Sequence, residues 1–302
     1  MNKFVLRQSA LLLLAATIWG VAFVAQSVGM EYVGPFTFLA SRSFIGASVL
    51  VPYILLSGRK TERIQMEQKT DQKLLVRGGI CCGSLLFVAS ILQQIGIMYT
   101  TVGKSGFITA MYIVIVPIIS IFLKKKAGIK IWIGVVLAVV GLYLLCMTSG
   151  NLLLQKGDVL TFLCAITFSF HILTVDYFAP QLDGVKLSCV QFATCGGLSA
   201  IGMVLFEVPT IEAVLSAWLP ILYAGALSSG VAYTLQIIGQ KGMNPTVASL
   251  LMSMESVISV IAGWVILKQA LSGRELAGCI FMFGAIVLVQ LPEKIGVAEV
   301  KK

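Results

Sequence analysis

Residues 245–267 read PTVASLLMSMESVISVIAGWVIL, a stretch of 23 residues whose only charged side chain is Glu255. A helix of about 20 apolar residues is long enough to cross the hydrocarbon core of a bilayer. Glu255 would then lie at membrane depth, where a charged side chain costs about 2.5–3.5 kcal/mol on insertion scales. Such residues usually face a bundle interior or a water-filled path. The stretch therefore predicts a membrane helix with a functional or structural carboxyl near its middle.

Similar apolar runs recur along the whole chain. Of its 302 residues, 58% are hydrophobic and only 12% are charged, whereas soluble domains carry about 25% charged residues. The ten runs of membrane-spanning length are Ala10–Val28, Pro35–Leu56, Leu75–Ile97, Ser105–Leu123, Ile131–Met147, Val159–Val175, Leu187–Phe206, Trp218–Ile238, Pro245–Leu267 and Leu276–Leu291. The sequence predicts an all-α fold, a polytopic membrane bundle of ten transmembrane helices.

The net charge of +9 is distributed as in a membrane protein. With ten spans and a cytoplasmic N-terminus, only Lys104, Lys156, Lys268 and Arg274 face outward, Arg42 lies inside a span, and the other lysines and arginines face inward. This is the positive-inside pattern, so we expect contact with anionic lipid, not nucleic acid. The prediction is a multi-pass inner (plasma) membrane protein with both termini in the cytoplasm. The acids Glu31, Glu207 and Glu212 are expected to be solvated loop charges.

The chain repeats itself. At an offset of 144, residues 105–123 align with residues 249–267, and an offset of 149 relates the first and sixth runs. The repeat divides the chain into residues 1–150 and 151–302. Because five helices per half is an odd number, the second half enters the membrane from the opposite side. The prediction is an inverted repeat of two five-helix halves, an architecture frequent among secondary transporters.

Several stretches resemble a known family. The second half contains Asn244-Pro-Thr-Val-Ala-Ser-Leu-Leu-Met-Ser-Met-Glu-Ser-Val, followed by Gly263-Trp-Val-Ile-Leu-Lys-Gln-Ala-Leu-Ser and Gly278. Together with Trp19-Gly-Val-Ala-Phe, Pro35 and Arg42, these residues resemble the EamA family of the drug/metabolite transporter superfamily. The resemblance implies ten helices in two five-helix repeats, and transport. The chain departs from the family pattern at Ser256, where a proline often follows the glutamate, and at Gln269, where a second glutamate often stands.

Glu255 is the principal candidate site residue. Ser249, Ser253 and Ser256 recur at helical spacing next to it and form one polar face with it. Small hydroxyl residues also let membrane helices pack closely, which is the simpler interpretation for the serines alone. Burial disfavours a charged carboxylate and a bound cation favours it. Our hypothesis is that Glu255 is either the acid that binds a substrate ammonium or the acid that couples transport to protons.

Other polar and aromatic side chains at membrane depth are candidates for a substrate cavity. Arg42 can bind a carboxylate, pair with an acid or extend outward along the helix. The single histidine, His171, can relay protons or hold neighbouring helices by a hydrogen bond. Amides and aromatic rings can line a cavity or pack between helices. The full candidate set is Glu255, Arg42, Gln93, Gln94, Gln236, Trp19, Tyr112, Tyr233, Ser253 and His171.

Several chemistries lack the residues they need. Gly103-Lys104-Ser105 is similar to the end of a P-loop, but Met98 stands where its first glycine belongs. One histidine and no Cys-x-x-Cys pair exclude the common zinc sites. The seven cysteines fall in apolar runs and are read as packing residues. We expect no enzyme activity, no metal and no cofactor.

These features predict a secondary active transporter of a small organic metabolite such as an amino acid or amine. Two similar halves of opposite orientation offer two near-equivalent packings, so alternating access is expected. Transport would be coupled to protons or proceed as facilitated diffusion, and the resemblance implies export. Two alternatives stay open. One is a flippase for a lipid-linked substrate, which needs a groove open sideways to lipid. The other is a non-transporting membrane sensor or accessory subunit.

Overall fold

The computed structural model describes residues 3–61, 72–99, 102–123, 128–146, 155–267 and 272–290. Within these ranges every regular element is a helix, so the all-α prediction is confirmed. The polar residues between the second and third predicted runs lie mostly outside the described residues, as do Lys268 and Gln269.

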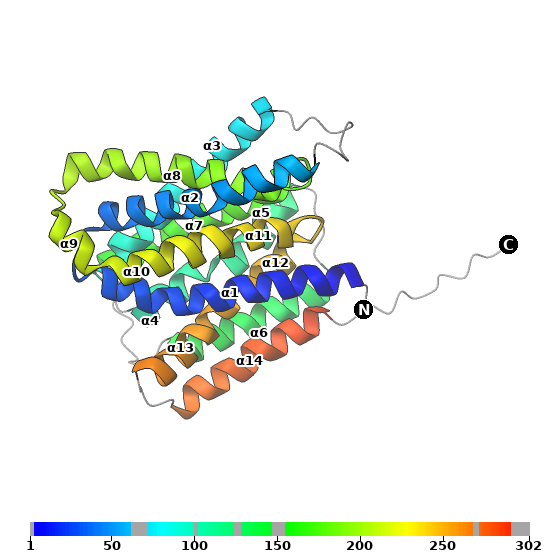
Figure 1. Ribbon diagram of the computed structural model, residues 1–302. Coiled ribbons are helices and arrows are strands. Elements are labelled where there is room, and N and C mark those ends of the chain that lie inside the picture. Colours follow the sequence, from blue (N-terminus) through cyan, green and yellow to red (C-terminus); the bar gives the residue numbers. More distant parts are fainter. Residues whose placement is uncertain are drawn as a thin grey trace.

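The helices run mostly along one common direction, as in a membrane bundle (Figure 1). In chain order they are α1 (Lys3–Gly29), α2 (Pro35–Thr61), α3 (Gln72–Ile97), α4 (Val102–Thr109), α5 (Tyr112–Phe122), α6 (Ile129–Cys146), α7 (Lys156–Phe178), α8 (Gly184–Phe206), α9 (Ile211–Ser216), α10 (Trp218–Leu222), η1 (Tyr223–Ala232), α11 (Tyr233–Gln240), α12 (Pro245–Met252), α13 (Met254–Leu267) and α14 (Gly273–Gln290).

Eight helical segments of the described chain are long and apolar enough to cross a bilayer. They are α1, α2, α3, α4 with α5, α7, α8, α10 through α11, and α12 with α13. They match the first four predicted runs and the sixth to ninth. The fifth run forms α6, which is apolar but shorter over Ile129–Leu144. The tenth forms α14, whose first turn contains Arg274 and Glu275.

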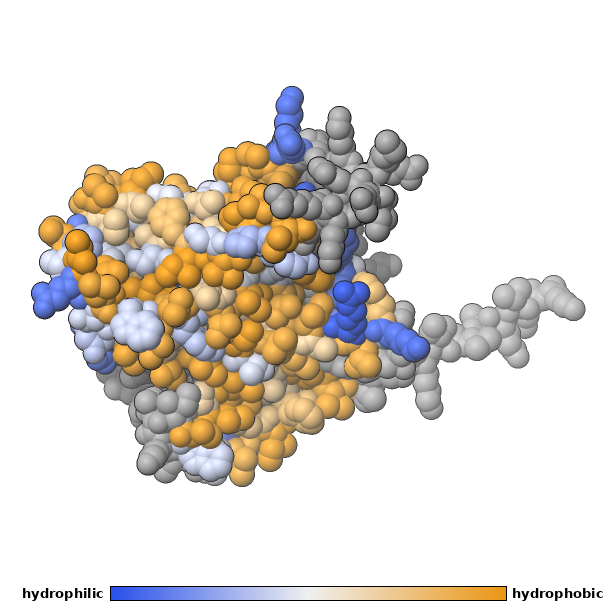
Figure 2. Space-filling model, in the orientation of Figure 1, coloured by the Kyte–Doolittle hydropathy of each residue, from blue (hydrophilic) through white to orange (hydrophobic). Residues whose placement is uncertain are grey.

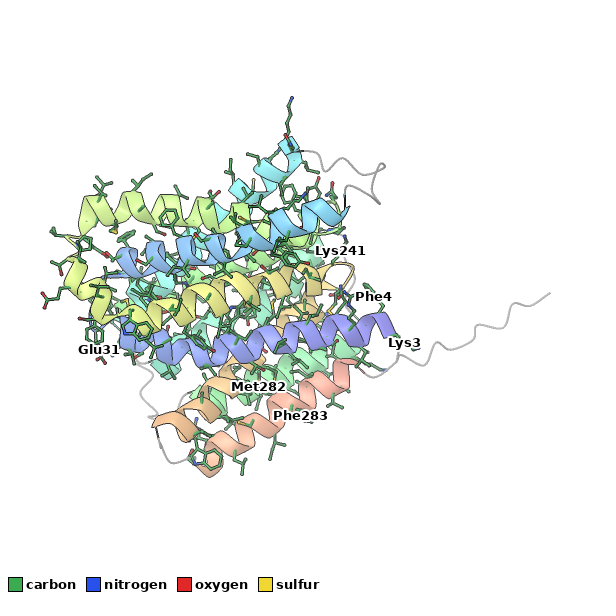
Figure 3. The ribbon with its side chains drawn as sticks, in the orientation of Figure 1. Lys3, Phe4, Glu31, Lys241, Met282 and Phe283 are labelled. Atoms are coloured by element: carbon green, nitrogen blue, oxygen red, sulfur yellow. The ribbon has the colours of Figure 1, made fainter. Side chains whose placement is uncertain are left out.

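The surface is apolar along the sides of the bundle and charged toward its ends (Figure 2). Large apolar side chains are exposed on many helices, including Leu55 (65% exposed), Val204 (75%) and Phe283 (62%). So much exposed apolar surface suits a lipid environment. Lys3 and Lys241 lie at one end and Glu31 at the other (Figure 3). The chain is therefore a multi-pass membrane protein.

Three predicted spans are interrupted helices. The fourth breaks at Ala110–Met111, between α4 and α5, and the ninth breaks at Ser253, between α12 and α13. The Ser253 hydroxyl donates to the Leu250 carbonyl over 2.8 Å, a local bond that competes with the backbone ladder of a helix. In the eighth span the 10-residue π-helix η1 separates α10 from α11. Such π segments are frequent at functional sites.

Helices from the two halves of the chain are interleaved. The main pairs are α2 with α8, α3 with both α7 and α8, α6 with α14, and α1 with α13. Gly20 on α1 shows how closely the last pair approaches. A Cβ at Gly20 would lie 2.6 Å from the Ile258 Cβ and 2.8 Å from the Glu255 carbonyl oxygen. Glycine is needed at this position because only a hydrogen fits between the two backbones.

Glu207 is not the solvated loop charge that we expected. Its carboxylate accepts hydrogen bonds of 2.8 Å from the backbone N–H groups of Phe36 and Thr37, and one of 2.5 Å from the Thr37 hydroxyl. The N–H groups at a helix start lack partners within the helix, and an anion there is favourable. Glu207 therefore joins the end of α8 to the start of α2. This role could not be predicted from the sequence, because Glu207 and Thr37 are 170 residues apart in the chain.

Candidate functional site

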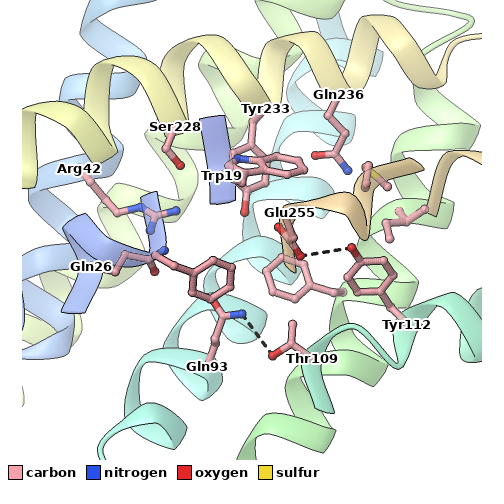
Figure 4. A pocket seen from close by; sticks show the side chains of 14 residues that line it. Trp19, Gln26, Arg42, Gln93, Thr109, Tyr112, Ser228, Tyr233, Gln236 and Glu255 are labelled. Carbon is pink, nitrogen blue, oxygen red and sulfur yellow. Dashed lines mark hydrogen bonds between the residues drawn. The ribbon is translucent and has the colours of Figure 1, made fainter. Parts of the chain in front are cut away.

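A cavity lies inside the bundle, and ten of the helices contribute to its wall. Its lining residues are Trp19, Phe23, Gln26, Arg42, Gln93, Thr109, Tyr112, Phe168, Ile172, Ser228, Tyr233, Gln236, Met252 and Glu255 (Figure 4). The space left for the centres of water-sized molecules is about 60 Å³. One water needs about 10–15 Å³ on this measure, so the cavity holds several waters. A larger solute requires side chains or helices to move.

Glu255 enters the cavity at the break in the ninth span. It lies in the first turn of α13, where the partial positive charge of the helix start favours a carboxylate. The Tyr112 hydroxyl donates a 3.2 Å hydrogen bond to its carboxylate (Figure 4). Tyr112 is itself the first residue of α5, just after the other break. The two interrupted spans pack on one another through α5 and α12, and this hydrogen bond joins them at their breaks.

The helix ends that precede the breaks also reach the cavity. Thr109 is the last residue of α4 and Met252 is the last residue of α12, and both belong to the lining. Backbone carbonyls at a helix end lack helical partners and carry partial negative charge. The breaks therefore place the negative ends of two short helices at the cavity that contains the Glu255 carboxylate, and this field suits a positively charged group.

Arg42 supplies a positive charge in the same cavity. Only 4% of its surface is exposed, and its Nε atom has no hydrogen-bond partner among the described residues. Gln26 and Ser228 share this part of the lining with it (Figure 4). A guanidinium has five N–H donors in a planar fork, so it is able to bind a planar anion such as a carboxylate through two hydrogen bonds.

The wall next to Glu255 is aromatic. The ring centroids of Trp19 and Tyr233 lie 4.7 Å apart at 61°, an edge-on contact, and the ring centroid of Phe192 lies 5.3 Å from that of Tyr233. The Trp19 indole N–H and the Gln236 carbonyl oxygen have no partner within the described chain. Aromatic faces attract cations. The indole N–H can donate a hydrogen bond to a ligand, and the amide oxygen can accept one.

Seven of the ten predicted site residues line this cavity, and three lie outside the lining. The seven are Trp19, Arg42, Gln93, Tyr112, Tyr233, Gln236 and Glu255. His171 is fully buried and its Nε2 lies 3.0 Å from the Gln191 side-chain oxygen. Gln94 is buried, and its Nε2 has no hydrogen-bond partner in the part of the chain that the structure describes. The Ser253 hydroxyl donates to the Leu250 carbonyl near the end of α12, as expected of a packing residue.

Sequence reasoning missed three polar lining residues. Gln26 lies near the end of an apolar run, and a polar residue in such a run could have been selected as a candidate for the cavity. Thr109 accepts a 3.3 Å hydrogen bond from the Gln93 amide, and Ser228 lies in η1. Hydroxyl residues are common in membrane helices, so nothing in the sequence distinguished these two.

The chain is similar to one transporter family over most of its length. The model of the EamA-like transporter family matches residues 7–147 and again residues 155–291. An uncharacterized transporter of Archaeoglobus fulgidus is 27% identical over 281 residues, which cover 93% of this chain and 84% of that protein. The uncharacterized transporter YwfM of Bacillus subtilis is 26% identical over 307 residues, 96% of each chain.

Two further matches concern a fragment and the fold. Protein PecM of Dickeya dadantii is 31% identical over 97 residues, which cover 32% of this chain and 33% of that protein. A solved crystal structure superposes with a TM-score of 0.77 over 94% of this chain and 98% of its own, at 21% identity. This likeness shows a shared fold.

Proposed function

The chain belongs to the EamA-like transporter family, and on that premise we propose that it is a secondary active transporter of small metabolites that carry an ammonium group, such as amino acids or amines. One observation carries the proposal. Glu255 and Arg42, of opposite charge, face the same cavity, and within the described residues no ion pair joins them. Two buried opposite charges that do not neutralise one another suit a ligand with charges of both signs.

In this proposal each lining group has a role. Glu255 binds the substrate ammonium, and Arg42 binds a substrate carboxylate. Trp19 and Tyr233 face the ammonium with their rings, as cation–π contacts require. The amides of Gln93 and Gln236 and the hydroxyl of Tyr112 supply further hydrogen bonds. Gln94, His171 and Ser253 lie outside the lining and are assigned to positioning neighbouring helices.

Glu255 is also the proposed coupling group. A carboxyl in a water-poor cavity is costly as an anion unless a cation is nearby. It can therefore hold a proton in one stage of the cycle and a substrate ammonium in the next. Exchanging one for the other would couple export of substrate to entry of protons.

The proposed architecture is ten spans in two inverted halves, residues 1–150 and 151–302. Two separate family matches, one in each half, support it. So do the helix breaks: at the offset of 144, Thr109, which ends α4, aligns with Ser253, which follows α12. Similar halves with matching breaks beside one cavity favour alternating access. We further propose an inner-membrane location with cytoplasmic termini, based on the distribution of lysine and arginine.

The flippase alternative receives less support. A flippase for lipid-linked molecules needs a polar cavity that continues sideways into lipid. The crevice between α3, α5 and α7 is open at the surface, but most of its lining is apolar and it shares no lining residue with the cavity. A sensor or accessory subunit would bind a ligand without flux, and the experiment below distinguishes it.

The test is transport by the purified protein in liposomes. Labelled amino acids and amines are screened with and without a pH gradient, alongside Glu255→Gln and Arg42→Gln. The wild type is expected to accumulate one class of substrate along the gradient. Glu255→Gln keeps the size of the side chain but cannot exchange a proton, so gradient-driven accumulation should be lost while the protein stays folded.

Arg42→Gln tests the second charge separately. The substitution should weaken transport of an amino acid by at least tenfold, because a charge-assisted hydrogen bond contributes about 1.5–3 kcal/mol. Transport of the corresponding amine, which has no carboxylate, should change little. Normal, pH-dependent flux in Glu255→Gln would refute the coupling role. Binding without flux in the folded wild type would support the sensor alternative instead.

A further inference from the structure

A crevice opens on the side of the bundle, away from the cavity. Its lining residues are Leu74, Arg77, Cys81, Leu85, Ile119, Leu123, Phe170, Leu173, Thr174, Tyr177 and Phe178, and it leaves about 620 Å³ for the centres of water-sized molecules. Both α3 and α5 pack on α7, but they make few or no contacts with each other. The start of α3 stands away from the body of the bundle (Figure 1). The crevice is the space between these two helices.

The polar groups of the crevice gather at one level. A Cβ added to Gly78 would lie 3.0 Å from the Phe178 ring, so Arg77 and Tyr177, one residue earlier on each helix, lie at a similar depth. Arg77 is exposed, and Thr174 lies one turn from the end of α7. This level is near the start of α3 and the end of α7, where a membrane interface is expected and where arginine and tyrosine are favoured.

Below this level the crevice is apolar. Leu85 and Phe170 mark its inner part, and the stretch of α7 from Phe170 to Phe178 is about 12 Å long at 1.5 Å per residue. Phe170 is 47% exposed and Tyr177 is 63% exposed. A cation and two hydroxyls above an apolar slot of this length match a phosphate headgroup above an acyl chain.

We propose that this crevice is a binding site for one anionic phospholipid. Arg77, with Tyr177 and Thr174, contacts the headgroup, and an acyl chain lies between α3, α5 and α7. Arg77 is the cation of this lining, and its charge favours an anionic over a zwitterionic headgroup. Basic pockets between membrane helices on the cytoplasmic side are known to bind such lipids.

The test is native mass spectrometry of the full-length protein in detergent, titrated with phosphatidylglycerol or phosphatidylcholine of the same acyl chains. The wild type should bind one phosphatidylglycerol more tightly than phosphatidylcholine. Arg77→Gln should weaken phosphatidylglycerol binding by about fivefold, as expected for one cation near anionic lipid. The matched control is Arg7→Gln, an exposed arginine on α1 at the same end of the bundle, which should have little effect.

Two further measurements separate the parts of the site. Cys81→Trp fills the crevice without removing charge, and it should reduce binding of both lipids. Glycerol phosphate, which has the headgroup charge without acyl chains, should not compete. Equal affinity for the two lipids, an equal loss in Arg7→Gln, or competition by glycerol phosphate at lipid-like concentrations would each overturn the proposal.

Discussion

Gly20→Ala tests whether the close approach of α1 and α13 holds the site together. The added Cβ would lie 2.6 Å from the Ile258 Cβ and 2.8 Å from the Glu255 carbonyl oxygen. Ordinary carbon contacts are about 3.5–4.0 Å, so the two helices must separate by roughly 1 Å. Because one of the crowded atoms belongs to the backbone, a rotamer change cannot relieve the overlap.

Two opposing effects set the expected change in the free energy of unfolding. Overpacking a well-packed site costs about 1–3 kcal/mol, and we expect the upper part of that range. Replacing glycine by alanine within a helix stabilises it by about 1 kcal/mol. Gly197→Ala on α8 isolates the second term, because a Cβ there would meet no atom within 4 Å. The difference between the two variants should therefore be about 2–3 kcal/mol.

The assay is reversible unfolding in mixed micelles, followed by helical circular dichroism, with substrate binding measured in parallel. Gly20→Ala should be less stable than Gly197→Ala and should bind substrate more weakly, because α13 shifts at Glu255. If the two alanine variants are equally stable, the close approach is not a constraint on the fold and the reasoning fails.

Three further predictions concern contacts at the ends of the bundle and in the cavity. Glu207→Ala should lower the free energy of unfolding by about 2 kcal/mol, because hydrogen bonds to a charged group and a helix cap are lost together. The control Glu31→Ala, at the same end of the bundle, should change this free energy by less than about 0.5 kcal/mol. Equal effects of the two substitutions would contradict the capping role of Glu207. Gln8→Ala removes two 2.8 Å bonds to the carbonyls of Ile238 and Lys241 and should cost about 1–2 kcal/mol, measured in the same unfolding assay. Trp19→Leu should weaken binding of an ammonium substrate by about 2- to 30-fold, the range of a cation–π contact; an equal loss for a neutral analogue would show that the ring acts through packing alone.

Much of the fold follows from the composition and spacing of the chain. Apolar runs without charges predict membrane helices because bilayer thickness sets the length of a span, and eight of them are confirmed as segments of sufficient length. The same argument selected Glu255, since a lone acid in such a run needs a special environment. Seven of the ten candidate residues were found at one cavity because polar groups at membrane depth avoid lipid and therefore face the interior.

The interruptions of the helices were not predictable. Hydropathy averages over a window and reports the same apolar run whether the helix is continuous or broken at Ser253. The breaks arise from local hydrogen bonds and from packing against other helices, so they depend on tertiary context. They matter because they bring Glu255 and Tyr112 to the starts of two helices that face one another.

The amino-acid pattern is sufficient to identify a helical membrane bundle and the side chains at membrane depth, because insertion in lipid depends on the composition of each segment alone. Which of those side chains share a cavity depends on how the helices pack. The tertiary structure separated His171, Gln94 and Ser253 from the lining, added Gln26, Thr109 and Ser228 to it, and turned Glu207 into a helix cap. Such contacts join residues far apart in the chain, and which faces meet is set by how closely the backbones approach, as at Gly20.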